Sequence, residues 1–138
     1  MKKTTIALSC IILLTICVVA QTPGGGVKAS LERGEAAYKL YCLTCHQPDG
    51  EGVPKLNPPL IQTSYVTGDK KKLIQWVLKG STENIPIDGK KYSNNMAAQS
   101  YLKDQEIADV LTYIRKSFGN KASAVTEAEV KAVRAATK

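Results

Sequence analysis

The chain has 138 residues, 43% of them hydrophobic, and its 19 basic and 12 acidic residues give a formal net charge of +7. This length allows one ordinary domain and the apolar fraction is that of a globular protein, so neither a second core nor wholesale disorder is required. Large apolar side chains are scarce, with one Phe, one Trp and six Tyr. A bulky buried cofactor would fill the part of the core that these few side chains cannot fill.

The first twenty residues have the features of a secretory signal peptide. Lys2 and Lys3 precede an apolar run at residues 6–19, and small residues stand before Gln21, where we expect cleavage. A permanent membrane helix is one alternative, but the run is shorter than the ~20 residues that span a bilayer. A lipid anchor on Cys17 is another. We therefore expect a periplasmic protein, with attachment to the membrane through Cys17 or an uncleaved signal as the alternative.

Removal of residues 1–20 changes both the charge and the cysteine content. It takes away two of the four cysteines and two lysines, which leaves 17 basic against 12 acidic residues and a charge of +5. Residues 21–29 contain Pro23 and three consecutive glycines, and we expect a flexible linker there. The folded domain is expected at 30–120, followed by a C-terminal tail at 121–138.

The first predicted helix leads into a cysteine motif. Apolar and small residues recur at helical spacings of three and four, at Leu31, Gly34, Ala37, Tyr38 and Tyr41. The next five residues are Cys42-Leu43-Thr44-Cys45-His46. Two thiols three residues apart on one helical turn point the same way, so both can add to the vinyl groups of one haem. The adjacent His46 can then turn its imidazole onto the iron.

Two other readings of the C-x-x-C-H motif are weighed against haem attachment. A structural zinc site needs four Cys or His ligands, and after loss of the signal peptide the chain has only these three. A thioredoxin-like redox pair would follow a buried strand in a βαβ unit. Here the motif follows a predicted helix and precedes turn residues at 48–52. The sequence therefore favours one covalently bound haem c.

Four further elements are predicted downstream of the motif. Asp69 is expected to cap a helix that contains Leu73 to Leu78 and stops at Gly80. Residues 85–92, with Asp88-Gly89 at their centre, predict a short hairpin or turn. A second amphipathic helix is expected over 104–118, with Asp104 as its cap. At 125–130, a capping box and a hydrophobic staple predict a short terminal helix that covers the domain surface, with partner docking as the alternative.

The order of these features resembles that of class I c-type cytochromes, the small bacterial periplasmic proteins with one haem. The resemblance covers residues 30–120 and rests on Gly34, Tyr38, the motif at 42–46, Pro58-Pro59-Leu60, Met96 and the segment 107–115. It implies an all-α cytochrome c fold, in which the N- and C-terminal helices cross around one covalent haem. Gly34 would permit that crossing and Tyr38 would meet Tyr113. The short terminal helix is an addition to this plan.

The resemblance also implies the iron ligands, His46 and Met96. The family's distal methionine lies in a loop shortly before the C-terminal helix, which matches Met96, and the chain has no other methionine besides Met1. In an arbitrary protein a single Met is more often a core filler. The family places Pro after this Met, whereas Ala97 stands here. The freer loop is expected to make the bond between Met96 and iron labile.

The same resemblance also implies which residues surround the haem. A ligating imidazole donates its second N–H to a carbonyl, and Pro58 or Pro59 would supply that carbonyl here. Leu60 and Trp76 are expected to contact the haem. Tyr92 would lie near a haem propionate, with an ordinary packed tyrosine as the alternative.

Ligation by His46 and Met96 would leave no iron position for a substrate, so the expected function is electron transfer and not enzyme catalysis. The alternative is a haem enzyme or gas sensor with an open sixth site, although the chain offers no second histidine for peroxide chemistry. Expected partners are redox proteins with an acidic docking surface, and nucleic acid is not expected. Six lysines would favour such encounters or simply be solvated: Lys70, Lys71, Lys72, Lys79, Lys90 and Lys91.

Overall fold

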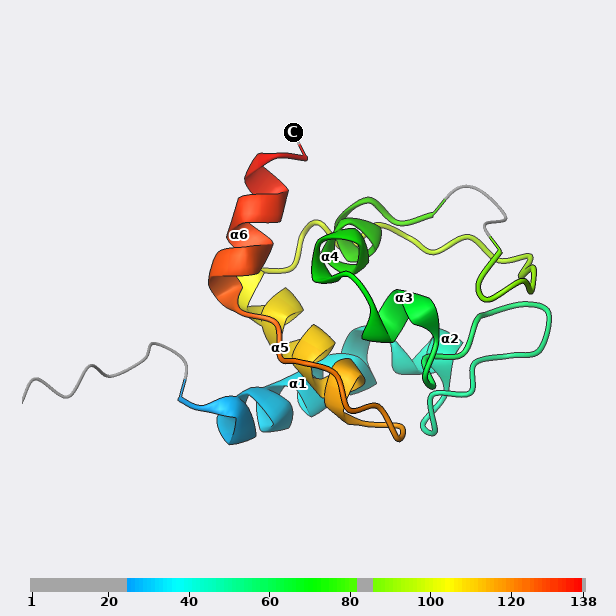
Figure 1. Cartoon of the computed structure of the whole chain (residues 1–138), viewed down its shortest axis with the longest axis horizontal. Coiled ribbons are helices and arrows are strands. Elements are labelled where there is room, and N and C mark those ends of the chain that lie inside the picture. Colours follow the sequence, from blue (N-terminus) through cyan, green and yellow to red (C-terminus); the bar gives the residue numbers. More distant parts are fainter. Residues whose placement is uncertain (1–24, 82–85, 138) are drawn as a thin grey trace, which may run out of the picture.

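The computed structural model describes residues 25–81 and 86–137, so the predicted signal peptide, Cys17 and Ile85 lie outside it. The described residues form helices and isolated bridges but no strand, which confirms the predicted all-α class. The helices are α1 (Val27–Tyr41), α2 (Leu43–His46), α3 (Ser64–Thr67), α4 (Lys70–Lys79), α5 (Asp104–Lys116) and α6 (Glu127–Ala135) (Figure 1). None of the described helices is long and apolar enough to cross a membrane.

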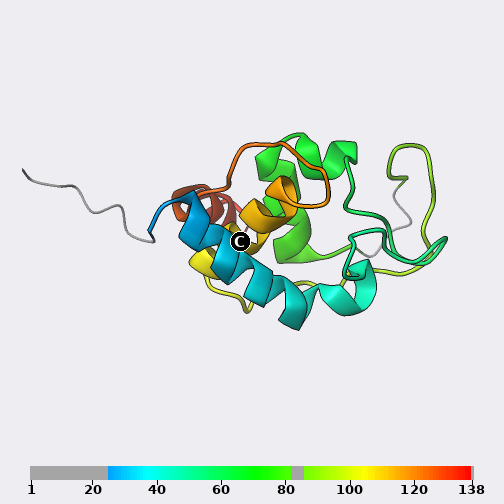
Figure 2. The ribbon, with the colours of Figure 1, turned by 90° about the horizontal axis from the view of Figure 1, so that it is seen from below.

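Helices α1 and α5 cross at Gly34, as predicted (Figure 2). A Cβ atom at Gly34 would lie 2.1 Å from the carbonyl oxygen of Asp109 and 2.7 Å from Cβ of Tyr113. The rings of Tyr38 and Tyr113 are 5.4 Å apart, and Phe118 completes the aromatic cluster. The two helices can therefore approach this closely only because Gly34 has no side chain.

A buried carboxylate joins the two helices beside this crossing. Asp109 is 2% exposed, and its oxygens accept hydrogen bonds from Ser30 Oγ at 2.6 Å and from Arg33 at 2.6 and 2.9 Å. A buried charge is tolerated when it is paired in this way. These contacts also explain why α1 starts at Val27 and not near residue 30. The prediction of a flexible linker is wrong for residues 27–29, because Asp109 holds the first turns of the helix.

Helix α4 has the predicted ends. The Asp69 side chain accepts a hydrogen bond from the backbone of Lys72 at 2.9 Å, and Gly80 ends the helix with a φ of 70°. The predicted turn is also present, because Ile87 and Lys90 exchange backbone hydrogen bonds across Asp88 and Gly89. Both central residues have positive φ, which is the geometry that a two-residue hairpin turn requires.

The expected cap of α5 is wrong. Lys103 occupies the capping position, and its backbone N–H donates to Glu106 Oε2 at 2.8 Å. Asp104 is the first helical residue, and its carboxylate accepts a hydrogen bond from Arg134 of α6 instead. The helix ends at Lys116, two residues earlier than predicted.

Helix α6 begins with the predicted capping box. The backbone N–H of Thr126 donates to Glu129 Oε2 at 2.8 Å, and the Glu129 N–H donates to Thr126 Oγ1. The two staple residues are buried, with Val125 4% and Val130 0% exposed. The helix packs on α4 and α5, so it covers the domain as expected.

Candidate functional site

One apolar cavity of about 290 Å³ is lined by all nine residues that the sequence analysis predicts to bind or contact the haem. Its lining includes Cys42, Cys45, His46, Pro58, Pro59, Leu60, Trp76, Tyr92 and Met96. The rest of the wall combines aliphatic residues of α3, α4 and α5 with residues of the connecting loops, among them Asn57, Asn94 and Asn95. A mostly apolar cavity with a few polar groups is the usual form of a cofactor site.

The two thiols of the motif lie where α1 gives way to α2. The chain turns at Cys42, whose carbonyl oxygen accepts hydrogen bonds from the backbone of Cys45 at 3.1 Å and of His46 at 2.9 Å. Both cysteines are free thiols, Cys42 half-buried and Cys45 exposed. This local turn places both sulfur-bearing residues and the imidazole on the cavity wall.

The acidity of Cys42 bears on the alternative of a thiol–disulfide site. Burial, together with the neighbouring Cys45, raises the pKa of the Cys42 thiol to about 11. The attacking cysteine of a C-x-x-C redox motif needs the opposite shift, because the thiolate is the nucleophile. Burial of Cys42 therefore disfavours this thiol as the attacking group of a disulfide exchange.

The His46 ring is held by a single defined hydrogen bond. Its Nδ1 is 3.0 Å from the carbonyl oxygen of Pro58. A carbonyl can only accept, so Nδ1 carries the proton and the neutral ring keeps a free lone pair on Nε2. Burial lowers the pKa of His46, and the hydrogen bond to Pro58 opposes this only in part. Of the two prolines left open by the sequence, Pro58 is the acceptor.

The loop that carries Pro58 is folded back onto the motif. The backbone N–H of Leu60 donates to the carbonyl of Gly50 at 2.7 Å, and the Tyr38 hydroxyl donates to the carbonyl of Gln47 at 2.6 Å. The aromatic cluster at the helix crossing is thus linked directly to the residue after His46.

Met96 reaches the cavity from a loop attached to the end of α4. Its carbonyl accepts a hydrogen bond from the backbone of Ser81 at 2.8 Å, and the Gln99 N–H donates to the carbonyl of Val77 at 2.8 Å. A Cβ atom at Gly80 would lie 2.3 Å from the Met96 carbonyl oxygen. Gly80 therefore both ends α4 and admits the Met96 backbone.

Several lining residues were not foreseen in the sequence. Tyr65 packs edge-on against Trp76 with ring centres 5.8 Å apart, and Asn94 Nδ2 donates to Asn57 Oδ1 at 3.0 Å at the cavity. These residues lie in loops or in the four-residue helix α3, where no periodic pattern marks a buried face. No local sequence feature could have identified them.

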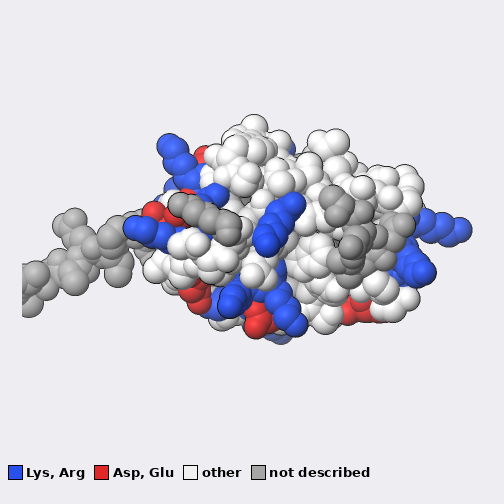
Figure 3. Space-filling model, turned by 90° about the horizontal axis from the view of Figure 1, so that it is seen from above, with Lys and Arg blue, Asp and Glu red and all other residues white. Residues whose placement is uncertain are grey.

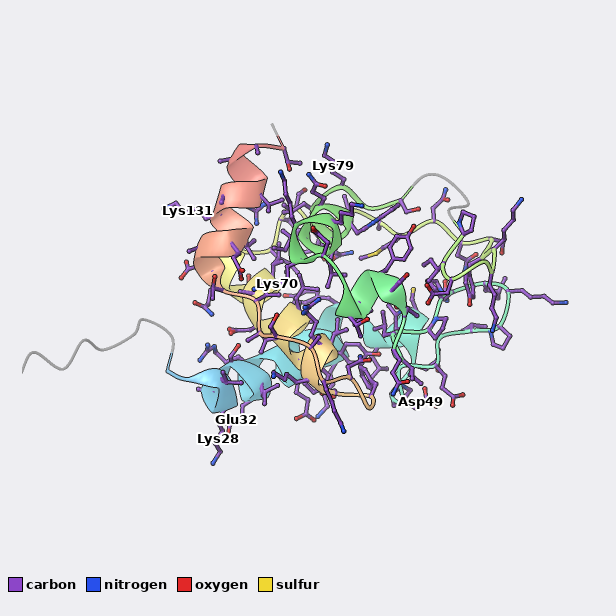
Figure 4. All side chains as sticks on the ribbon, in the orientation of Figure 1. Lys28, Glu32, Asp49, Lys70, Lys79 and Lys131 are labelled. Atoms are coloured by element: carbon purple, nitrogen blue, oxygen red, sulfur yellow. The ribbon has the colours of Figure 1, made fainter. Side chains whose placement is uncertain are left out.

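The six lysines do not act as one group. Lys70 is half-buried, forms an ion pair with Glu129 and donates to the carbonyl of Ala124 at 3.1 Å, so it faces α6 (Figure 4). The expectation that Lys70 helps to attract acidic redox partners is therefore wrong. The others are exposed, at positions 71, 72, 79, 90 and 91.

The donor set fits a covalently held haem better than a metal ion alone. No cluster of three His, Cys, Asp or Glu side chains suited to a metal occurs within residues 25–81 and 86–137. The cavity instead combines two thiols, one neutral imidazole and one thioether with an apolar wall. Iron in a haem needs only the last two as axial ligands.

Comparisons with known proteins agree with this chemistry. Residues 31–118 match the family model described as Cytochrome c. Cytochrome c-552 of Thermus thermophilus is 34% identical over 100 residues, which are 70% of this chain and 67% of that protein. The cytochrome c subunit of alcohol dehydrogenase (quinone) from Gluconacetobacter polyoxogenes is 33% identical over 111 residues, 73% of this chain but 22% of that subunit. The gluconate 2-dehydrogenase cytochrome c subunit of Pantoea cypripedii is 35% identical over 108 residues, 75% of this chain and 24% of the subunit.

Proposed function

Because this chain belongs to the cytochrome c family, whose members carry covalent haem c, we propose that it is a periplasmic electron carrier with His46 and Met96 as iron ligands. It transfers electrons and is not an enzyme. The observation that supports the ligand set most strongly is the cavity that both side chains line. Export to the periplasm rests on the signal peptide predicted at residues 1–20.

Each motif residue has a separate role in this proposal. Cys42 and Cys45 form thioethers to one haem, and His46 presents Nε2 to the iron while Pro58 holds the ring through Nδ1. When bound, the haem iron supplies a one-electron couple. The hydrogen bond to Pro58 fixes the ring orientation and makes the imidazole a better ligand.

The remaining cavity residues set the surroundings of the iron. Met96 would supply its thioether as the second iron ligand, and Leu60 and Trp76 would exclude water from the haem. Methionine ligation and an apolar environment both raise the reduction potential. Tyr92, half-buried at the cavity, would donate a hydrogen bond to a haem propionate. Together they favour electron transfer over binding of a substrate.

Absorption spectroscopy tests the attachment and the ligands together. We expect the pyridine haemochrome of the purified protein to report two thioether bonds, and the oxidised protein to show the weak red band of methionine sulfur on ferric haem. A double Cys42→Ala, Cys45→Ala variant is the matched control and should lose its haem to acidified acetone. A colourless wild-type protein would contradict the proposal. A coloured protein without the red band at neutral pH would exclude only Met96 as the ligand.

The second candidate is a haem protein with an open sixth site, and Ala97 is the observation that favours it. The usual proline is missing after Met96, and the two residues that follow, Ala97 and Ala98, are exposed. Rapid binding of carbon monoxide to the reduced protein would support this candidate. Slow or undetectable binding would support the carrier.

Redox proteins are the proposed partners, with an acidic docking surface. The relatives that are cytochrome subunits of dehydrogenases support a periplasmic dehydrogenase as electron donor. On the face drawn in Figure 3, basic side chains project at both ends of the molecule beside broad uncharged areas. Exposed lysines near the cavity, including Lys79 next to Gly80, would attract an acidic surface.

Charge reversal at Lys79 should slow the oxidation of the reduced protein by anionic ferricyanide several-fold at low salt. The effect should vanish as ionic strength rises, because exposed charges are screened beyond about 10 Å at 0.1 M salt. Stopped-flow rates of Lys79→Glu and Lys131→Glu provide the comparison. Lys131 carries the same charge but lies on α6, well away from Lys79 in Figure 4. Equal rates for the two variants would refute a role for the charge of Lys79 in attracting an anionic partner.

A further inference from the structure

Helix α6 lies beyond the residues that match the family model, which end at 118, and yet it contacts the segment that carries Met96. We call residues 96–103 the ligand loop. We propose that Arg134 of α6 is a positioning residue that holds the ligand loop closed and thereby keeps Met96 on the haem iron. This inference rests on the axial role proposed for Met96.

The Arg134 guanidinium joins the end of the ligand loop to the start of α5. Nη1 donates to the carbonyl of Ser100 at 2.7 Å, Nη2 donates to the carbonyl of Leu102 at 2.7 Å, and Nε donates to Asp104 Oδ1 at 2.6 Å. The side chains of Arg134 and Asp104 are 28% and 22% exposed, so solvent screens their ion pair only in part. A planar fork of donors fits three fixed acceptors in a way that a lysine cannot.

The ligand loop is attached to the rest of the fold by two sets of hydrogen bonds, one in each half. In its first half, the backbone of Met96 and Gln99 is bonded to Ser81 and Val77 of the α4 terminus. Four of its side chains are exposed: Tyr101, whose ring centre lies 6.1 Å from that of Tyr41 of α1, is 68% exposed, and Ala97, Ala98 and Ser100 are exposed as well. Such a segment has little packing to resist opening. The contacts of Arg134 at Ser100 and Leu102 therefore define the second attachment.

Leu102 links this second attachment to the cavity itself. Its side chain is 5% exposed and lines the cavity with Met96, while its carbonyl is held by Arg134. If Arg134 releases the Leu102 carbonyl, the Leu102 side chain can leave the cavity wall. The backbone on both sides of Gln99 then gains conformational freedom. Opening the loop in this way would withdraw the Met96 sulfur.

Helix α6 gives Arg134 a fixed position from which to act. Val130 and Val133 are buried against α4 and α5, Glu129 pairs with Lys70, and Thr126 caps the helix (Figure 1). A side chain on a packed helix loses less entropy on forming its bonds than one on a mobile tail. Arg134 thus supplies from outside the loop a restraint that a proline after Met96 would supply locally.

Binding of imidazole to the oxidised holoprotein tests this role. We expect Arg134→Gln to bind imidazole about tenfold more tightly, because its apparent affinity rises with the population of the open loop. Arg33→Gln is the matched control, since Arg33 makes the same kind of pair with Asp109 of α5, at 2.6 Å, and directs both of its hydrogen bonds to that carboxylate and not to the ligand loop. Arg134→Lys should recover only part of the wild-type behaviour.

Two further readouts separate positioning from loss of stability. Guanidinium unfolding gives the stability of each variant, and hydrogen exchange at the Gln99 and Leu102 amides reports loop opening without any added ligand. Faster exchange and tighter imidazole binding in Arg134→Gln than in an equally destabilised Arg33→Gln would support the proposal. Equal behaviour of the two variants, with the red band present in the wild type, would overturn it. Absence of that band from the wild type would instead overturn the axial role of Met96, and this inference with it.

Discussion

Replacement of Met96 by Ala is expected to lower the reduction potential of the holoprotein by about 0.1–0.3 V, a fraction of the ≈0.8 V that axial ligands span. A thioether is a soft ligand that favours ferrous over ferric iron, and water or hydroxide in its place does not. The red absorption band should disappear in the same variant. Spectroelectrochemical titration of the wild type and Met96→Ala measures both effects.

Gln99→Ala is the control for this experiment. It alters the same loop and removes the local side-chain contacts to the Ala97 carbonyl and the Tyr101 hydroxyl, but it leaves the sulfur in place. Its potential should stay near that of the wild type. If Met96→Ala kept both the red band and the wild-type potential, the sixth ligand would have to be another residue. Rapid carbon monoxide binding by reduced Met96→Ala would further show that Met96 is what separates a carrier from a gas-binding protein.

Gly34→Ala is expected to destabilise the protein by about 3 kcal/mol, at the upper end of the usual overpacking cost. The added Cβ would lie 2.1 Å from a backbone oxygen of α5, which cannot move without displacing the helix. Separation of α1 and α5 would also stretch the hydrogen bonds that Ser30 and Arg33 make to Asp109. Guanidinium denaturation of the holoprotein measures the loss.

The sign of this change is what makes it informative. Helix propensity alone would have Ala stabilise the helix by about 1 kcal/mol relative to Gly. The reverse substitution at an exposed position of the same helix, Ala36→Gly, should cost about that amount and no more. A Gly34→Ala protein more stable than the wild type would mean that the close crossing does not form in solution.

Features that depend on neighbours in the chain were predicted well. Asp69 and Thr126 cap their helices as expected, because a capping side chain bonds to a backbone group only three residues away. The turn at Asp88-Gly89 is likewise local. The residues Cys42, Cys45 and His46 come together on one helical turn, so their shared orientation follows from spacing alone.

Among features that depend on distant partners, the crossing of α1 and α5 at Gly34 was predicted because the family resemblance implies it, and others were predicted wrongly. The start of α1 at Val27 and the bonding of Asp104 to Arg134 reflect contacts with residues far along the chain. Lys70 was misplaced for the same reason, since Glu129, with which it pairs, lies on another helix.

The sequence, together with the family that it resembles, was enough to predict the all-α class, the caps at Asp69 and Thr126, the haem-binding motif and a single candidate for the sixth ligand. Only the tertiary structure decided that Pro58 and not Pro59 accepts the His46 hydrogen bond, and that the backbone around Met96 rests on Gly80. It alone placed Arg134 against the ligand loop. The physical reason is range: helical periodicity and capping act over three or four residues, whereas these contacts form between segments that only the folded chain brings together.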